Sequence, residues 1–323
     1  MIISKTPLRI SFAGGGTDMQ SYYQTGYGAV VSMAISKYIY VAVHRRFDDS
    51  IRISYTDTEI VDCVDEIQHS IVRECLKMVG IPRGVEITTI GEVPAGTGLG
   101  SSSSLTVGLL NALYAFIGVQ LSANELMERA CQIEIQILKS PIGKQDQSAA
   151  AFGGINYFKF HKDETVTREK LWLSDSATRT LEHNLMVFYT GMQRDANVIL
   201  AQQKKDTASK LAVLDCMREQ ANELRTMLLQ NNVGPDFGRL LHEGWLKKRS
   251  VTGSISNSRI DELYETARKA GAVGGKLLGA GGGGFLLVYC EEPYQKSVQE
   301  ALGLQQMYLH IARYGSRIVY FNG

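Results

Sequence analysis

The order of hydrophobic and polar positions predicts a chain that begins with strands. Residues 8–12 alternate between apolar and polar side chains, as a half-buried strand does, and the alternation ends in the glycines of residues 13–18. Segments rich in β-branched and aromatic residues are expected to be strands as well. These segments are residues 27–43, 51–55, 85–90, 149–160, 185–189, 285–290 and 318–321.

Helical spacing of apolar residues appears between these strands. Residues 101–117 are apolar on nearly all sides, which predicts a buried helix that Gly118 ends. Residues 122–139 open with the capping box Ser122-x-x-Glu125. Further helices are expected at about 64–79, 195–205, 208–230, 235–248, 257–270 and 294–302. Because strands and helices do not alternate regularly, the pattern predicts an α+β fold with antiparallel sheets.

A charged stretch poor in apolar residues, 159–170, is expected to be a loop near a domain boundary. A chain of 323 residues has room for about two domains. We therefore predict an N-terminal domain over 1–170 and a C-terminal domain over 171–323.

Composition excludes several classes of protein. Hydrophobic residues make up 44% and charged residues 21%, as in globular chains, and no apolar run approaches the ~18 residues of a membrane span. With 34 Lys and Arg against 33 Asp and Glu, nothing indicates binding of nucleic acid or an anionic membrane. The N-terminus lacks the pattern of a signal peptide, and the five cysteines form no C-x-x-C pair. We expect a reduced, cytoplasmic protein.

One number stands out, the 32 glycines, about 10% of the chain against an average of about 7%. They gather in AGGGTD at 13–18, GTGLGSSSS at 96–104 and GGKLLGAGGGGF at 274–285. Each cluster adjoins strongly apolar sequence, which predicts loops held by rigid elements, where binding residues concentrate.

The second cluster has the properties of a phosphate site. Glycines let backbone N–H groups approach a ligand, and the first N–H groups of the following helix have no partner within it. Together with the positive end of the helix dipole they favour anions. The pattern is not Walker A, because Ser101 stands where that motif requires lysine. A plain serine helix cap is the alternative interpretation.

Two carboxylates follow this cluster. Glu134 lies near the edge of the apolar face of the predicted helix 122–139, where it either binds a cation or reaches solvent. Asp146 lies in a segment of small residues just before a predicted strand, and it either orients a nucleophile near phosphate or caps a turn.

Taken together, these motifs resemble those of the GHMP small-molecule kinases. TPLRISFAGGGTD (6–18), PAGTGLGSSSSL (94–105) and KLLGAGGGGF (276–285) look like the three motifs of that family, in order. The resemblance implies a two-domain fold, with an N-terminal domain like ribosomal protein S5 domain 2 and a ferredoxin-like C-terminal domain. It also implies ATP and Mg²⁺ as cofactors.

The resemblance assigns roles to single residues. Asp146 and Arg9 match the catalytic pair, and Ser102 and Glu134 match the Mg²⁺ ligands. The residues expected to bind the nucleotide are Pro94, Gly96, Thr97, Gly98, Leu99, Gly100, Ser101, Ser102 and Ser103. Those expected to bind the substrate are Gly15, Gly16, Thr17, Asp18, Asp146, Arg194, Gly281 and Gly282.

Within the family, three segments look most like bacterial D-glycero-D-manno-heptose 7-phosphate kinases. They are Gly14 to Asp18, residues 143–156 and residues 189–194. Galactokinases usually have G-E-H-T-D at the first of these. This likeness implies transfer of the ATP γ-phosphoryl group to the anomeric hydroxyl of a sugar phosphate. Fucokinase-like and galactokinase-like kinases remain alternatives.

An acceptor that already carries a phosphate needs a second anion site. Its candidates are Arg194, which follows a strand and a glycine, and the basic run Lys247, Lys248 and Arg249. The partners expected are a small sugar phosphate and ATP, with neither nucleic acid nor membrane. For the oligomeric state, a homodimer and a monomer are both alternatives.

Two further interpretations compete with a kinase. Gly279-x-Gly281-x-x-Gly284 fits the dinucleotide fingerprint, but a strand follows it where that fingerprint requires a helix. A non-catalytic sugar sensor is expected to have lost the base or a metal ligand, whereas Asp146, Glu134, Ser102 and Arg9 are all present.

Overall fold

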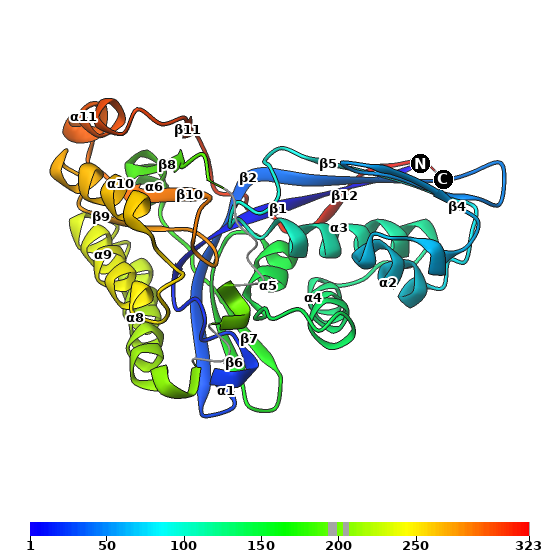
Figure 1. Ribbon diagram of the computed structural model, residues 1–323, viewed down its shortest axis with the longest axis horizontal. Helices are drawn as coiled ribbons and strands as arrows, with labels where there is room; N and C mark the ends of the chain where they lie inside the picture. Colours follow the sequence, from blue (N-terminus) through cyan, green and yellow to red (C-terminus); the bar gives the residue numbers. More distant parts are fainter. Residues whose placement is uncertain (193–198, 203–206, 323) are drawn as a thin grey trace.

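The structure, a computed structural model, describes residues 1–192, 199–202 and 207–322. Its elements form two packed regions, each built on its own sheet (Figure 1). The first region contains β1 (Ile2–Ala13), β2 (Tyr27–Arg45), β3 (Ile51–Ser54), β4 (Thr58–Val61), β5 (Val85–Gly91), β6 (Ile155–His161), β7 (Val166–Lys170) and β12 (Arg317–Phe321). Its helices are α1 (Gln20–Tyr23), α2 (Ser70–Val79), α3 (Ser101–Phe116), α4 (Ala123–Cys131) and α5 (Gln145–Phe152).

The second region follows β7 along the chain. Its strands are β8 (Leu185–Tyr189), β9 (Gly274–Leu277), β10 (Phe285–Tyr289) and β11 (Gln306–Met307). Its helices are α6 (Asp175–Asn184), α8 (Leu211–Leu229), α9 (Pro235–Arg249), α10 (Ser258–Lys269) and α11 (Glu292–Leu302). Other helical segments include the 3₁₀ turns Val64–Glu66 and Thr207–Lys210 and the π-helical segment Gln132–Ile137.

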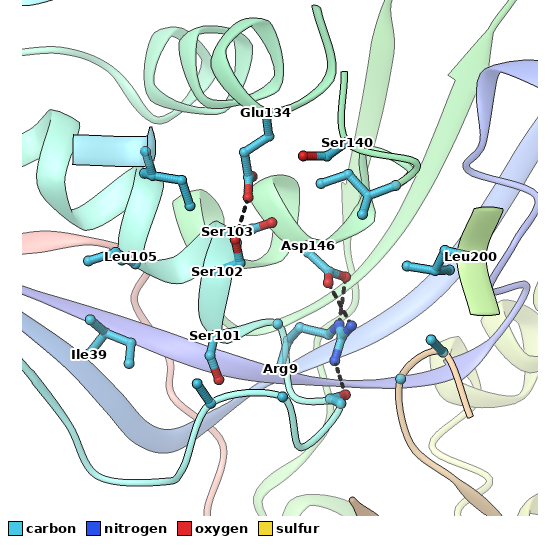
Figure 2. A pocket seen from close by; sticks show the side chains of 18 of the residues that line it. Arg9, Ile39, Ser101, Ser102, Ser103, Leu105, Glu134, Ser140, Asp146 and Leu200 are labelled. Carbon is cyan, nitrogen blue, oxygen red and sulfur yellow. Dashed lines mark hydrogen bonds and ion pairs between the residues drawn. The ribbon is translucent and has the colours of Figure 1, made fainter. Parts of the chain in front are cut away.

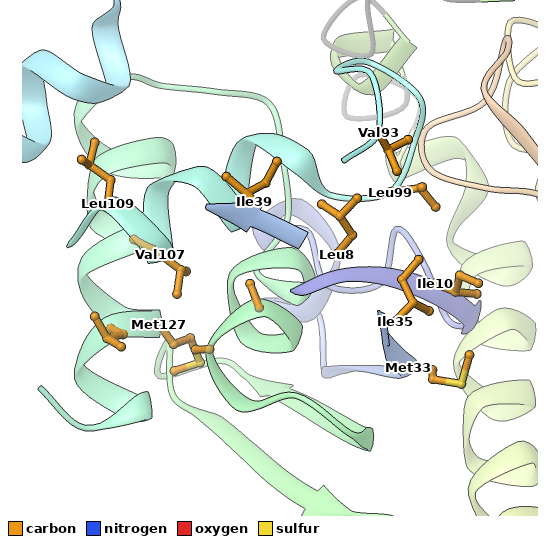
Figure 3. Close-up of a cluster of buried hydrophobic side chains, with 14 of the residues drawn as sticks. Leu8, Ile10, Met33, Ile35, Ile39, Val93, Leu99, Val107, Leu109 and Met127 are labelled. Atoms are coloured by element: carbon orange, nitrogen blue, oxygen red, sulfur yellow. The ribbon is translucent and has the colours of Figure 1, made fainter. Parts of the chain in front are cut away.

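The first sheet has the strand order β12-β1-β2-β5-β3-β4, with β6 and β7 continuing from the other part of β2. All its pairs are antiparallel except β3 with β5. The helix α3 packs against β1 and β2, and ten of its residues are buried, as its apolar residues on nearly all sides predict. Leu8, Leu99 and Val107 belong to the core around this helix (Figure 3).

The second sheet has the order β11-β8-β10-β9, again antiparallel. Helix α9 packs against β9 and β10, and it brings Trp245 into a second core with Phe188 and Tyr264. Among the residues described, no helix is long and apolar enough to cross a membrane.

The predicted α+β class with two sheets is confirmed, as are the strands expected at 27–43 and 85–90 and the helix at 101–117. Two of the predicted segments need the largest correction. Residues 149–160 are not one strand, because the alanines of 149–151 continue helix α5 until Gly153 and Gly154, both with positive φ, end it. Residues 159–170 are not a loop but most of the β6–β7 hairpin, whose partly exposed side chains tolerate charge.

The final strand returns to the first region. β12 pairs with β1, where Ile2 faces Phe321, and the amino group of Met1 donates to the carbonyl of Asn322 at 2.7 Å. Figure 1 shows both termini at the same end of the molecule. The domain boundary at 170/171 stays a prediction, and residues 317–321 lie with the N-terminal sheet in the structure.

Candidate active site

A pocket of about 1070 Å³ lies where the two regions meet. From the first region it is lined by β1, the glycine loop 94–100, the start of α3 and the segment from Glu134 to Asp146. From the second region Lys248, Gly279 and Ala280 contribute to its wall. The structure thus brings residues of all three glycine clusters to one cavity.

Arg9 and Asp146 form an ion pair in this pocket (Figure 2). Nε and Nη2 of Arg9 donate to the two carboxylate oxygens of Asp146, each at 2.7 Å, and Nη1 donates to the carbonyl of Gly98 at 2.6 Å. Asp146 lies in the first turn of α5, not in a loop before a strand as predicted. Such a two-point bond fixes the carboxylate in one orientation.

The loop before α3 has the backbone of an anion site. Gly96, Gly98 and Gly100 all have φ between +74° and +83°, which glycine adopts without strain. Gly100 is the N-cap of α3 and offers no side chain to the first N–H groups of the helix. Ser101 Oγ lines the pocket and is buried without a hydrogen-bond partner among the residues described. Both features favour a phosphate ligand here.

Glu134 is buried at the edge of the same site, with 1% of its surface exposed. Its carboxylate accepts hydrogen bonds from Ser102 Oγ at 2.9 Å and from Gln147 Nε2 at 2.7 Å. Burial raises the pKa of Glu134 to about 7, although the hydrogen bonds of Ser103, Ser102 and Gln147 oppose the shift. The alternative of a solvent-facing glutamate is excluded by this burial.

A π-helical segment places Glu134 there. The predicted helix 122–139 stops being α-helical after Cys131, and Leu138 N–H donates to the carbonyl of Ile133, five residues earlier. A wider turn rotates the following side chains relative to a regular helix, and such turns are frequent at functional sites. Glu134 thereby points toward Ser102 and Ser103 at the start of α3 (Figure 2).

Asp18 lines the part of the pocket near β1. Its oxygens accept hydrogen bonds from the backbone N–H groups of Gly16 at 2.9 Å and Gln145 at 3.2 Å. Burial and, secondly, the charge of Asp146 raise the pKa of Asp18 above its usual value. Gly15 and Gly16 also line the pocket, whereas Thr17 is turned away and donates to the carbonyls of Gly14 and Ala29.

Some predicted site residues do not line the cavity. Thr97 and Leu99 do not line the pocket, and both residues are fully buried. Gly281 and Gly282 pack against Ile255 instead. Arg194 lies outside the described residues. Of the basic run on α9, Arg249 pairs with Asp261 at 2.7 Å, and Lys248 lines the pocket.

The sequence analysis did not identify several residues that line the pocket. Ser11 Oγ, Gln145 Oε1 and His69 Nδ1 are buried in the pocket wall without a hydrogen-bond partner among the described residues. The alternation of β1 places Ser11 on the same face as Arg9, so Ser11 could have been found from the sequence. His69 precedes α2, far from every glycine cluster, and no sequence signal indicates it.

The fold and the site define a kinase. The family model of the GHMP kinases N terminal domain matches residues 64–154, and that of GHMP kinases C terminal matches residues 227–308. Together they cover more than half of the chain, which therefore belongs to the GHMP kinase family, as its motifs predict. Membership implies ATP as the phosphoryl donor.

Individual relatives agree with this assignment. The chain is 29% identical over 325 residues to D-glycero-alpha-D-manno-heptose 7-phosphate kinase of Campylobacter jejuni, and the match covers 95% of both proteins. It resembles the crystal structure of a D-glycero-D-manno-heptose 1-phosphate kinase from Bacteroides thetaiotaomicron, with a TM-score of 0.84, 25% identity and full coverage of both chains. It is 27% identical to L-fucokinase/L-fucose-1-P guanylyltransferase of Bacteroides fragilis, over 91% of this chain and 35% of that protein.

Proposed function

We propose that this kinase transfers the γ-phosphoryl group of ATP to the anomeric hydroxyl of D-glycero-D-manno-heptose 7-phosphate. The product would be heptose 1,7-bisphosphate, a precursor of nucleotide-activated heptose for surface polysaccharides. The observation that carries the proposal is the orientation of Asp146, which Arg9 holds in the same pocket as the glycine loop 94–100 and Asp18. The name of the Campylobacter relative, a heptose 7-phosphate kinase, supports this acceptor, and that of the Bacteroides thetaiotaomicron relative, a heptose 1-phosphate kinase, supports heptose as the sugar.

In this mechanism the acceptor hydroxyl attacks the γ-phosphorus directly. A bond forms from the hydroxyl oxygen to phosphorus while the bond from phosphorus to the bridging oxygen of ADP breaks. Asp146 orients the hydroxyl and accepts its proton, which then passes to solvent, and ADP leaves with the electron pair of the broken bond. Arg9 holds the carboxylate in one orientation for the attack. Positioning and electrostatic stabilisation supply most of the acceleration in such reactions.

The chain also fits a magnesium ion. Glu134 is a buried carboxylate whose described partners are all neutral donors, and the hydroxyl of Ser102 lies 2.9 Å from it. Hard oxygen atoms of this kind are the ligands that Mg²⁺ prefers, usually together with substrate phosphates. We propose that Glu134 and Ser102 hold Mg²⁺ beside the triphosphate. When bound, the ion would neutralise part of the phosphate charge.

Asp18 is proposed to bind hydroxyl groups of the sugar. Its oxygens are oriented by the backbone of Gly16 and Gln145, and the free atoms of Ser11 and Gln145 lie in the same part of the pocket wall. Gly15 brings Ser11 and Gln145 together, since a Cβ at Gly15 would lie 3.3 Å from Ser11 Oγ and 3.6 Å from Gln145 Nε2. This polar surface suits a molecule with several hydroxyl groups.

A panel assay of ATP consumption tests the choice of acceptor. Heptose 7-phosphate, heptose, fucose, galactose and mevalonate would each be offered at equal concentration, and the product of the best acceptor would be located by ³¹P NMR. We expect the highest kcat/KM with heptose 7-phosphate and a new phosphate on the anomeric carbon. A clear preference for fucose would contradict the proposal and assign the fucokinase-like alternative.

A further inference from the structure

Lys248 is a buried lysine that the proposed mechanism does not use. It lies in the last turn of α9, is only 6% exposed and lines the pocket from the second region. Its ammonium group donates a hydrogen bond to the carbonyl of Gly279. Gly279 in turn packs against the glycine loop 94–100. A Cβ at Gly279 would come within 2.3 Å of Gly98 Cα. Lys248 is thus anchored beside the loop expected to bind phosphate.

The charges around the pocket set Lys248 apart. Within the described residues, the basic side chains that line the cavity are Arg9, His69 and Lys248. The charge of Arg9 is balanced by Asp146. Burial lowers the pKa of His69, which favours the neutral form of its imidazole. No carboxylate of the described residues forms a direct ion pair with Lys248, although the charges of Asp18 and Asp146 act on it from farther away.

Burying an ammonium group without a direct ion pair costs free energy, and a bound anion would offset that cost. Burial and, secondly, the neighbouring charge of Arg9 lower the pKa of Lys248 to about 8. One of its three N–H donors is used by Gly279, and within the described residues no other hydrogen bond of the ammonium group is seen. The buried Lys276 likewise donates to a backbone carbonyl, that of Phe12, but it does not line the pocket.

We propose that Lys248 binds the γ-phosphoryl group of ATP through its ammonium group and stabilises that group during transfer. The Arg9–Asp146 pair is neutral as a unit and leaves the phosphoryl charge without a side-chain cation. Lys248 supplies that cation from the opposite wall, next to the glycine loop. The proposal rests on the proposed function only for the use of ATP, and it does not depend on which sugar is the acceptor.

Nucleotide binding without any acceptor provides the test. The affinities of the wild-type protein and of Lys248→Met for ADP and for the non-hydrolysable analogue AMP-PNP would be measured by calorimetry, with Mg²⁺ present. If Lys248 makes a charge-assisted hydrogen bond to the γ-phosphate, Lys248→Met should weaken the affinity for AMP-PNP by about ten-fold or more. The affinity for ADP should stay nearly unchanged. Lys248→Arg should recover part of the loss.

Lys269→Met is the matched control, since Lys269 is exposed at the end of α10 and its replacement changes the net charge equally. It should leave both affinities unchanged. Thermal unfolding shows whether Lys248→Met still folds, and Lys248→Arg carries the comparison if it does not. Equal effects on ADP and AMP-PNP would overturn the proposal. So would an effect confined to the KM of a phosphorylated acceptor, which would assign Lys248 to the acceptor's own phosphate.

Discussion

The guanidinium of Arg9 and the carboxylate of Asp146 are joined by two parallel hydrogen bonds of 2.7 Å. The pair links strand β1 to the first turn of α5 across 137 positions of sequence. Through this pair, the strand that leads into the first glycine cluster orients the carboxylate of Asp146. That carboxylate is the group expected to contact the acceptor hydroxyl. The consequences for activity can be tested from both sides.

Replacing Asp146 with asparagine should remove the proton acceptor while keeping the volume of the side chain. We expect kcat to fall by roughly 10²–10⁴, the range for loss of a general base, with the affinity for ADP retained. Steady-state kinetics and ADP titration measure the two quantities. Asp175→Asn is the control, because Asp175 also opens a helix but is exposed on α6. Near-normal kcat in Asp146→Asn would remove the assigned role.

Replacing Arg9 with lysine keeps the charge but loses the planar fork that holds both oxygens of Asp146 and the carbonyl of Gly98. We expect kcat to fall by at least about ten-fold, since a misplaced carboxylate orients the hydroxyl poorly. The KM for ATP should change less than kcat. If Arg9→Lys retained the wild-type kcat, the orientation of Asp146 would not limit the reaction.

Glu134 predicts an unusual dependence of stability on pH. Its pKa is about 7 in the folded chain against an ordinary value of 4.5, so the folded state binds the proton more tightly than the unfolded state. The free energy of unfolding of the metal-free protein should therefore fall as pH rises from about 4.5 to about 7. Urea unfolding at several pH values, compared with Glu134→Gln, isolates this contribution. An unchanged pH dependence in Glu134→Gln would contradict it.

The same carboxyl makes Mg²⁺ binding pH-dependent. A proton and the metal compete for Glu134, so we expect Mg²⁺ to raise the melting temperature at pH 8 and to have little effect at pH 5. In Glu134→Gln the stabilisation at pH 8 should largely disappear. A wild-type response to Mg²⁺ in that variant would show that the ion binds elsewhere.

Gly279→Ala tests the contact between the two regions. The new Cβ would lie 2.3 Å from Gly98 Cα, so one of the two glycine loops has to move. Gly80→Ala is the control, because Gly80 has a similar positive φ but nothing within 4 Å of a built Cβ. The control should lose about 1–2 kcal/mol of unfolding free energy from backbone strain alone. We expect Gly279→Ala to lose about 1–3 kcal/mol more and to bind ATP less tightly.

Much of this arrangement can be read from local sequence. The buried helix α3 and the strands of the first sheet follow from periodicity, and the glycine clusters indicate the loops around the pocket. The pairing of Arg9 with Asp146 came from the family resemblance, because no local pattern relates residues so far apart. The π-helical turn at 132–137 was not predictable, since it preserves the hydrophobic pattern of an ordinary helix while it changes where Glu134 points.

The wrong predictions have local causes as well. At 149–160, the apolar residues of a buried helix and of a buried strand run together, and periodicity alone does not separate them. At 159–170, the charged residues indicate a loop. A hairpin at the edge of a sheet also exposes its side chains, so the same charges are compatible with strands. Lys248 appeared in the sequence as one of three adjacent basic residues, and only the packing of α9 shows which of them faces the pocket.

The pairing of β12 with β1 has a consequence for biosynthesis. Ile2 is made by the ribosome 319 residues before its partner Phe321. Until then that edge of β1 remains an unpaired strand edge, which can recruit other chains. The first sheet therefore cannot be completed during translation of the N-terminal half, and truncations near the C-terminus should cause aggregation during expression even though they remove nothing from the pocket.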